Sequence, residues 1–256
     1  MVNMLDLEHL SYSSISLYLD CGESWRRKYV EKQPTIVSPA LIFGSAFHDT
    51  VEAAVGDPSA DLLKTWTVKW NKRVGEADVA WGADTPEFHH NEGLRILSDQ
   101  YVQEAIRAIK VGRDDMGIKV ERKVELRVPG VPIPIIGFID LITVDNIPCD
   151  LKTSARSWSE AKAADQLQSL FYLAALNQAG DDSHGWRFVH CVFVKTKEPK
   201  VQFFQHTHGP GEIFFLFKLI QSVWKGIERD VFPINPTGWK CDPKYCDFWA
   251  DCKGKY

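Results

Sequence analysis

The sequence predicts a mixed α/β (α+β) fold, in which a mixed central sheet is flanked by helices. Helical patterns dominate the chain up to residue 115, strand patterns begin abruptly after Gly117, and helical patterns return between and after the later strands. A length of 256 residues, with 45% hydrophobic and 25% charged residues, is enough for a well-buried core of ordinary composition.

Helices are expected in the first part of the chain. An amphipathic helix over residues 12–20 has Ser13 or Ser14 available as its cap and leads directly into Cys21. A second helix is expected to begin near Pro39. Residues 59–111 are expected to be mostly helical, with a break at the glycine and proline of residues 82–86.

Strands are expected from residue 119 onward. Residues 119–128 alternate apolar and charged side chains, which is typical of a strand with one solvated face, and Pro129–Gly130 then forms a turn. The remaining elements are strands at 135–144 and 147–153, a helix at 159–178 that Gly180 ends, strands at 187–195 and 200–206, and a helix at 212–229.

Two aspartates and a lysine stand within this strand region. Asp140 and Asp150 each follow apolar residues, and an ionised carboxylate in such a strand is costly unless something pairs with it. A divalent cation between the two acids would remove their repulsion, and oxygen ligands suit Mg²⁺ or Mn²⁺. Lys152 leaves the same strand face as Asp150, so its ammonium can orient an attacking water and stabilise charge on a phosphate.

This arrangement requires a particular hairpin register. A two-residue loop at residues 145–146 would place Asp140 opposite Leu151 and put the two acids on opposite faces of the sheet. A three-residue loop over residues 144–146, or a bulge, would place Asp140 opposite Asp150. We predict the odd-numbered loop.

Two helical pairs extend the pattern. His48 and Glu52 lie four residues apart on one face of the second helix, where imidazole and carboxylate can extend an oxygen-rich metal site. Gln168 and Tyr172 have the same spacing on the helix after the lysine. Each feature also has a structural explanation. His48 and Glu52 could form a surface contact, and Gln168 and Tyr172 could be packing residues. Asp140 and Lys152 could form a structural ion pair, with Asp150 in a turn.

Together these segments resemble the RecB-like branch of the PD-(D/E)XK nuclease superfamily, and they occur in that family's order. The matching segments are GSAFH with His48, GFID with Asp140, DLK with Asp150 and Lys152, and QSLFY with Gln168 and Tyr172. The second acid is aspartate where many relatives have glutamate, and the family pattern allows both.

This resemblance implies a restriction-endonuclease-like core and a role for each matching residue. His48, Asp140, Asp150 and the Leu151 backbone carbonyl would hold a catalytic Mg²⁺ or Mn²⁺, and Glu52 would have a lesser part at the metal. Lys152 would help position the attacking water. Gln168 and Tyr172 would order the site or contact DNA.

A second set of residues suggests a metal or cluster site. Cys241, Cys246 and Cys252 close the chain as C-x(4)-C-x(5)-C, and Cys21 lies near its start. The four thiols can form one site if the chain ends meet, and such a set could hold zinc or an iron-sulfur cluster. Disulfides are the alternative, which an intracellular setting disfavours.

Other cysteines and nearby basic residues have separate interpretations. Cys149 and Cys191 lie in apolar strands and are expected to be buried core thiols. Arg26, Arg27 and Lys244 lie beside the four-cysteine set and would form a DNA-binding patch, although the formal net charge of -4 gives no general support for nucleic-acid binding. Scattered solvated charges are the alternative.

Both chain ends resemble the iron-sulfur subset of this family, which is related to AddB nuclease domains and CRISPR-associated adaptation exonucleases. The matching segments are LSYSSISLYLDCGESWRRKYV and FPINPTGWKCDPKYCDFWADC. This resemblance implies that Cys21, Cys241, Cys246 and Cys252 hold a structural 4Fe-4S cluster, with zinc as the alternative. It also implies one nuclease domain over residues 1–256: an N-terminal helix and first cysteine (1–38), a helical part (39–115), the nuclease core (116–230) and a cluster-binding tail (231–256).

The sequence therefore predicts a metal-dependent DNA nuclease, with an exonuclease favoured, acting on single strands or duplex ends in recombination, repair, phage DNA metabolism or spacer processing. The chain has no G-x(4)-GK-[ST] motif, so a helicase, like a recombinase or integrase, would be a separate chain. No apolar run is long enough to span a membrane and the start lacks a signal-peptide pattern, so we expect a cytoplasmic protein of a bacterial or phage-infected cell. The alternatives are a catalytically silent DNA-binding or assembly subunit and an iron-sulfur redox or sensor protein.

Overall fold

The structure is a computed structural model that describes residues 7–256. The sequence analysis predicted from the start of the chain that a signal peptide is absent. Residues 1–6 of that segment lie outside the described residues. The chain divides into two compact units. We call Val37–Lys123 together with Phe138–His208 the core unit, and the described part of Met1–Ile36 together with Val124–Gly137 and Gly209–Tyr256 the terminal unit.

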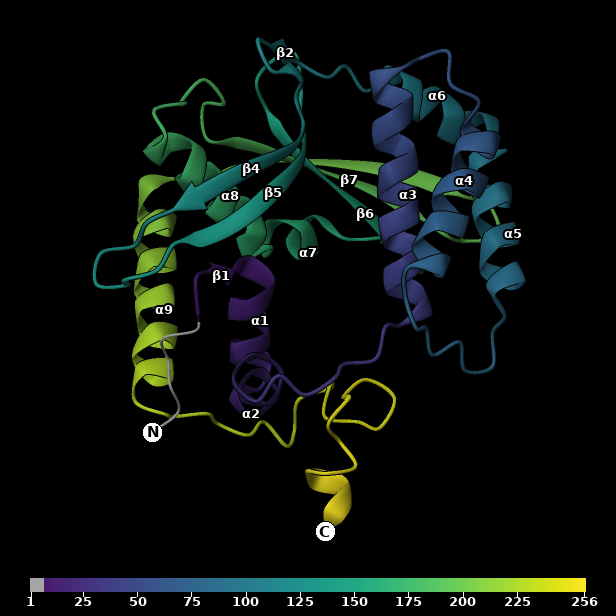
Figure 1. Cartoon of the computed structure of the whole chain (residues 1–256). Helices are drawn as coiled ribbons and strands as arrows, with labels where there is room; N and C mark the ends of the chain where they lie inside the picture. Colours follow the sequence, from purple (N-terminus) through teal and green to yellow (C-terminus); the bar gives the residue numbers. More distant parts are fainter. Residues whose placement is uncertain (1–6) are drawn as a thin grey trace. The chain divides into compact units, whose positions relative to one another are not determined.

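Four helices open the core unit. They are α3 (Pro39–Gly56), α4 (Leu62–Gly75), α5 (Pro86–Leu97) and α6 (Gln100–Ala108), and α3 lies beside α4 (Figure 1). Each follows a residue whose side-chain oxygen accepts a hydrogen bond from a backbone N–H of the first turn. These capping residues are Ser38, Asp61, Thr85 and Asp99. The helical pattern expected for this part of the chain is therefore confirmed, with each start fixed by its cap.

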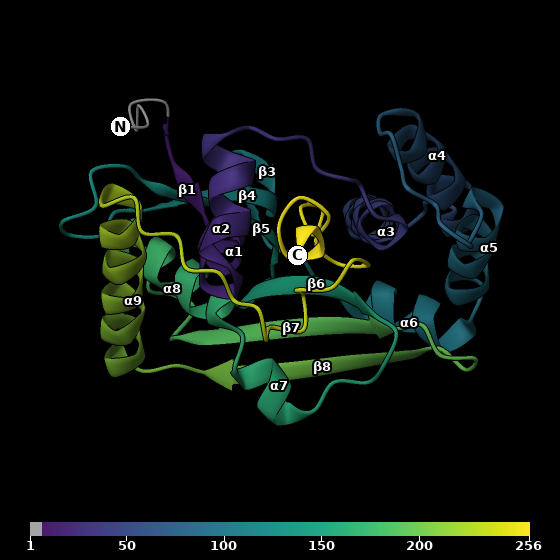
Figure 2. The same ribbon diagram turned by 90° about the horizontal axis from the view of Figure 1, so that it is seen from below.

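The sheet of the core unit is mixed, as predicted. The second half of β5 (Ile135–Ile142) pairs antiparallel with β6 (Pro148–Ser154), β6 pairs parallel with β7 (Arg187–Val194), and β7 pairs antiparallel with β8 (Lys200–Thr207). Figure 2 shows β6, β7 and β8 side by side. Two short strands, β2 (Arg113–Asp114) and β3 (Gly117–Ile118), form a separate pair, and β4 (Val120–Leu126) begins in this unit.

One face of this sheet packs against α3 to α6 and forms the main hydrophobic core. Leu141, Cys149 and Leu151 contribute from the strands, and Phe47 and Trp66 are fully buried from the helices. Strand alternation sends every second side chain into this core, so Asp150 and Lys152, on the intervening positions of β6, point to the other face. Cys149 and Cys191 are 3% and 0% exposed, which confirms the prediction that they are buried core thiols.

The helix expected at residues 159–178 is two helices. The first, α7, spans Glu160–Ala164, and the second, α8, spans Leu167–Gln178. Gln166 between them has an extended backbone (φ −77°, ψ 100°), and its carbonyl accepts hydrogen bonds from the backbone and the hydroxyl of Ser169. The alanine-rich periodicity is continuous across this point, so the pattern alone did not reveal the break.

The terminal unit joins both ends of the chain. A two-residue strand, β1 (Leu10–Ser11), pairs parallel with the first residues of β5 and leads into α1 (Tyr12–Asp20). The cap of α1 is Ser11 and not Ser13 or Ser14, because Ser11 and Ser14 exchange hydrogen bonds as a capping box. The helix α2 (Gly22–Trp25), the π-helical turn η2 (Arg26–Val30), the long α9 (Pro210–Glu228) and the 3-10 turn η3 (Lys253–Lys255) complete this unit.

The C-terminal tail lies against the N-terminal helices. The Tyr18 hydroxyl donates to the Val231 carbonyl at 2.5 Å, and Trp25 stacks on Phe232 with 5.8 Å between ring centroids. A side chain at Gly22 would come within 2.7 Å of Pro233, so this close approach requires glycine. The chain ends therefore meet, as the four-cysteine interpretation required. No helix within residues 7–256 is both long and apolar enough to span a bilayer.

Candidate active site

The hairpin between β5 and β6 sets the register of the two aspartates. Leu141 lies opposite Cys149, and because side chains alternate along each strand, Asp140 and Asp150, each one residue further from the loop, leave the same face of the sheet. The loop contains residues 144–146, because the Thr143 amide bonds to the Ile147 carbonyl at 2.9 Å. Asn146 closes this loop in the left-handed conformation (φ 57°), which asparagine tolerates better than most residues. The predicted odd-numbered loop is confirmed, and both acids belong to one face.

Asp140 is a buried carboxylate, 9% exposed. Its Oδ2 accepts a hydrogen bond from the Leu151 amide at 2.6 Å and lies 3.6 Å from Nδ1 of His48. Burial, and then repulsion by Asp150, raises the pKa of Asp140 to about 8. Burial lowers the pKa of His48 to about 4, so its imidazole is neutral at neutral pH and able to act as a metal ligand.

Lys152 forms an ion pair with Asp150 within β6. Its Nζ lies 2.8 Å from Oδ1 and 2.7 Å from Oδ2 of that carboxylate. Asp150 is 1% exposed, whereas the Lys152 side chain is 28% exposed. The alternative that put Asp150 in a turn is therefore wrong, because Asp150 is a strand residue bonded to the lysine.

A chain of hydrogen bonds runs from this ion pair into α8 and back to β5. Nζ of Lys152 donates to Oε1 of Gln168 at 3.0 Å, and Nε2 of Gln168 donates to the Tyr172 hydroxyl at 2.9 Å. The Tyr172 hydroxyl in turn donates to the Phe138 carbonyl at 2.5 Å. Burial raises the pKa of Tyr172, so the phenol keeps this proton. We call this series the Lys152–Gln168–Tyr172 relay.

Glu121, a carboxylate that the sequence analysis did not single out, lies beside Asp140 and Glu52. Oxygens of Glu52, Glu121 and Asp140 lie within 4.8 Å of one another, a grouping able to hold a metal ion. Burial, followed by the charge of Glu121, raises the pKa of Glu52. Oε1 of Glu52 is buried and has no hydrogen-bond partner within the described chain. Glu121 reads in the sequence as one of several solvent-facing residues of an alternating strand, and no local signal distinguishes it.

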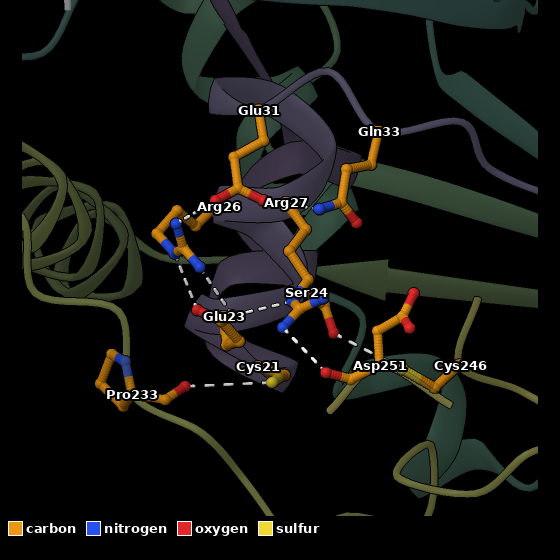
Figure 3. A network of polar contacts seen from close by, with 10 residues as sticks. All are labelled: Cys21, Glu23, Ser24, Arg26, Arg27, Glu31, Gln33, Pro233, Cys246 and Asp251. Carbon is orange, nitrogen blue, oxygen red and sulfur yellow. Dashed lines mark hydrogen bonds and ion pairs between the residues drawn. The ribbon is translucent and has the colours of Figure 1, made fainter. Parts of the chain in front are cut away.

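The four cysteines of the second set are brought together within the terminal unit. Cys21, Cys241, Cys246 and Cys252 all line one cavity of about 180 Å³. The Cys21 thiol lies 3.9 Å from the Pro233 carbonyl, and Cys246 lies 3.8 Å from the Ser24 hydroxyl (Figure 3).

The basic residues beside these cysteines differ in their surroundings. Arg26 and Arg27 converge on Glu23, with N–O distances of 2.8 Å for each (Figure 3). Arg26 also pairs with Glu31, and Arg27 also donates to the Asp251 carbonyl at 3.4 Å. Lys244, by contrast, is exposed. The structure therefore places the two arginines in a network that ties η2 to α2 and the tail.

Comparison with known proteins identifies the family. The model of the PD-(D/E)XK nuclease superfamily matches residues 9–253 of the chain, which is nearly its whole length. The chain belongs to the PD-(D/E)XK nuclease superfamily. The buried acids on adjacent strands and the neighbouring lysine therefore lie in the fold of a superfamily of hydrolases that act on nucleic acids.

One solved structure agrees with this fold. A candidate exonuclease from Eubacterium rectale is 13% identical, with a TM-score of 0.58 over 90% of this chain and 85% of that chain. The protein SSO0001 is 12% identical and covers 95% of this chain and 96% of that chain, but its TM-score of 0.38 is too low to add to the assignment. No curated protein matches the sequence.

Proposed function

We propose that this PD-(D/E)XK nuclease is a Mg²⁺- or Mn²⁺-dependent DNA exonuclease. The observation that carries the proposal is the presence of Asp140 and Asp150 on one face of two paired strands, with Lys152 bonded to Asp150 and held by Gln168. A silent binding module has no need for two acids of this kind in one apolar sheet, because their burial is costly. The exonuclease part of the proposal takes its support from the Eubacterium rectale protein.

The residues present fit a divalent cation. His48, Asp140, Asp150 and the Leu151 carbonyl would hold it, and Glu52 and Glu121 have oxygens near the Asp140 carboxylate. Burial, and then repulsion by neighbouring acids, raises the pKa values of Asp140 and Glu52, and a cation would relieve that repulsion. When bound, the cation supplies Lewis-acid stabilisation of the phosphate and lowers the pKa of water.

The protein's own groups would orient the reactants. The Lys152 ammonium, partly exposed beside Asp150, would donate to the attacking water and to a nonbridging phosphate oxygen. Gln168 fixes the direction of that ammonium through its side-chain oxygen, and Tyr172 fixes the amide of Gln168. Lys152 is thus the catalytic residue, while Gln168 and Tyr172 are positioning residues.

Cys21, Cys241, Cys246 and Cys252 line one cavity of the terminal unit, as the four ligands of a 4Fe-4S cluster would, with zinc as the alternative group for four thiolates. The cluster would be structural, tying the N-terminal helices to the C-terminal tail, as in the iron-sulfur subset of RecB-like nucleases.

A DNA-degradation experiment tests the nuclease proposal. Anaerobically purified protein would be incubated with end-labelled single- and double-stranded DNA, with Mn²⁺ or with EDTA, beside the Asp150→Ala variant. We expect shortening of the DNA from its ends only with Mn²⁺ and only with the wild-type protein. Intact DNA in every lane, with folded protein and a full cluster, would overturn the proposal in favour of a binding or assembly subunit. Activity of this kind would suit recombination, repair, phage DNA metabolism or spacer processing, alongside a separate helicase, recombinase or integrase.

A further inference from the structure

Two large aromatic side chains of the C-terminal tail are exposed. Trp239 is 69% exposed and Tyr245 is 54% exposed, and their ring centroids lie 5.2 Å apart at an interplanar angle of 70°. Phe248, a few residues further on, is 6% exposed. The tail therefore has room to bury an aromatic ring and yet presents these two to solvent, so packing within the unit does not explain them.

Local backbone bonds hold this aromatic pair in place. The Cys241 amide bonds to the Gly238 carbonyl at 2.8 Å, which makes a turn around Trp239. The amides of Tyr245 and Cys246 both bond to the Asp242 carbonyl at 3.0 Å, which makes a second turn. The side chain of Asn235 anchors the start of this segment by donating to the Asp20 carbonyl at 3.0 Å. Both aromatic residues therefore lie in turns that backbone hydrogen bonds stabilise, so little conformational entropy of the tail would be lost on binding.

Each ring has a lysine beside it. Nζ of Lys240 lies 5.5 Å from the Trp239 centroid, and Nζ of Lys244 lies 5.5 Å from the Tyr245 centroid. Lys240 also pairs with Asp20 at 2.5 Å, whereas Lys244 forms no ion pair within residues 7–256. Asp242 accepts from the Lys244 backbone amide and so is turned toward the main chain. The Lys244 ammonium therefore remains available to an anion.

Exposed rings beside ammonium groups match the chemistry of a single DNA strand. Its unpaired bases offer flat π-faces for stacking, and its phosphates offer negative charge. Duplex DNA hides its base faces, and protein interfaces are depleted of lysine. We propose that Trp239 and Tyr245, with Lys240 and Lys244, form a base-stacking site for single-stranded DNA. The inference rests on the proposed function only for the identity of the nucleic acid, since the site itself uses none of the residues of the candidate active site.

Binding to strands with and without bases tests this site. The full-length protein, with its cluster and in the Asp150→Asn background that prevents cleavage, would be titrated against a fluorescent oligo(dT) and against a strand of equal length whose central nucleotides are abasic. We expect Trp239→Ala and Tyr245→Ala each to raise the Kd for oligo(dT) about tenfold, and to leave the weaker binding of the abasic strand unchanged. Trp239→Phe, which keeps a ring, should restore most of the lost affinity. Lys244→Ala should reduce the salt slope of binding by about 0.7.

A matched control exists on α9. Phe214 is 67% exposed and has Nζ of Lys218 at 5.3 Å from its ring, so Phe214→Ala removes a similar lysine-flanked aromatic from another element of the same unit. An equal loss of binding in Phe214→Ala, an equal loss on both strands, or no loss in the tail variants would each overturn the proposal. So would a change in oligomeric state in Trp239→Ala without a change in DNA affinity, because the rings would then mark a self-association surface.

Failure of this inference is distinguishable from failure of the proposed function. Cleavage of the same oligonucleotide by the wild-type protein would be measured separately. Cleavage with no effect of Trp239→Ala on binding overturns the stacking site and leaves the nuclease. Base-dependent binding without any cleavage supports the stacking site and removes the nuclease activity.

Discussion

The side-chain oxygen of Gln168 accepts a hydrogen bond from Nζ of Lys152 at 3.0 Å. The lysine is also held by Asp150, so its ammonium is fixed between a carboxylate on its own strand and an amide on α8. A flexible four-carbon side chain is thereby confined to one direction before any substrate arrives, which is the kind of preorganisation that catalysis uses.

Lys152→Ala should reduce nuclease activity by about a hundredfold or more, because it removes the group that would donate to the attacking water and the phosphate. Metal binding should survive, since Asp140, Asp150 and His48 are unchanged. Steady-state cleavage of labelled DNA and calorimetric titration with Mn²⁺ would measure the two effects. Equal loss of cation binding would instead make the lysine a structural partner of Asp150.

Tyr172→Phe should lower activity by about 10- to 100-fold without abolishing it. The change removes the hydroxyl that accepts from Gln168 and donates to the Phe138 carbonyl. The Gln168 side chain, which holds Lys152, would then lose the hydrogen bond that orients it. A double-mutant cycle with Lys152→Ala is the informative measurement. If the relay acts through the lysine, Tyr172→Phe should cost little more once Lys152 is absent. Full additivity would show that Tyr172 acts by another route.

The cation-free protein should lose stability as pH rises, and Asp140 should be a main cause. Its pKa is raised from about 4 in an unfolded chain to about 8 in the fold. Between these two pH values the folded state keeps a proton on Asp140 that the unfolded state has lost. The contribution of Asp140 to the free energy of unfolding is therefore fully present below about pH 4 and is lost as pH rises toward about 8. Thermal unfolding in EDTA across this range should show a falling Tm, which Mg²⁺ restores most strongly at the alkaline end.

Asp140→Asn is the control for that pH dependence. The amide keeps an acceptor for the Leu151 amide but does not titrate, so the fall in Tm with pH should be shallower and the stabilisation by Mg²⁺ smaller. The same slope in the variant as in the wild type would assign the pH dependence to other groups, with Glu52 the next to test.

The sequence was most informative where a chemical requirement constrained the geometry. Asp140 and Asp150 could share a face only with an odd loop, and the register of the hairpin has that loop. The bonds of Gln168 were beyond prediction, because they depend on where α8 lies over β6 and not on any spacing along the chain. The division at Gln166 was missed for a related reason: a helical pattern records which faces are apolar but not a local change of backbone angle.

Glu121→Gln should weaken Mg²⁺ or Mn²⁺ binding by about tenfold, in the range typical for groups around a metal ligand. Glu121 escaped sequence analysis because its strand alternates charged and apolar residues, while its proximity to Glu52 and Asp140 arises only in the fold. Glu125→Gln, an exposed position of the same strand paired with Arg127, is the matched control and should leave affinity unchanged. Equal effects of both substitutions would indicate a general change in surface charge.

Cys21→Ala should abolish assembly of the proposed iron-sulfur cluster, whereas Cys149→Ala should not. Cys21 ends α1 and lines the cavity shared with the three cysteines of the tail, so its loss leaves three thiolates for a four-thiolate group. Cys149 is buried in the core unit, where burial raises the pKa of its thiol and so disfavours the thiolate form. Iron and acid-labile sulfide would be assayed after anaerobic purification, with limited proteolysis as a second measure. Because the group would tie the tail to α1 and α2, Cys21→Ala should also expose residues 231–256 to cleavage. Retention of iron in Cys21→Ala would remove Cys21 from the ligand set. Loss of iron in Cys149→Ala at unchanged Tm would instead assign Cys149 as a ligand.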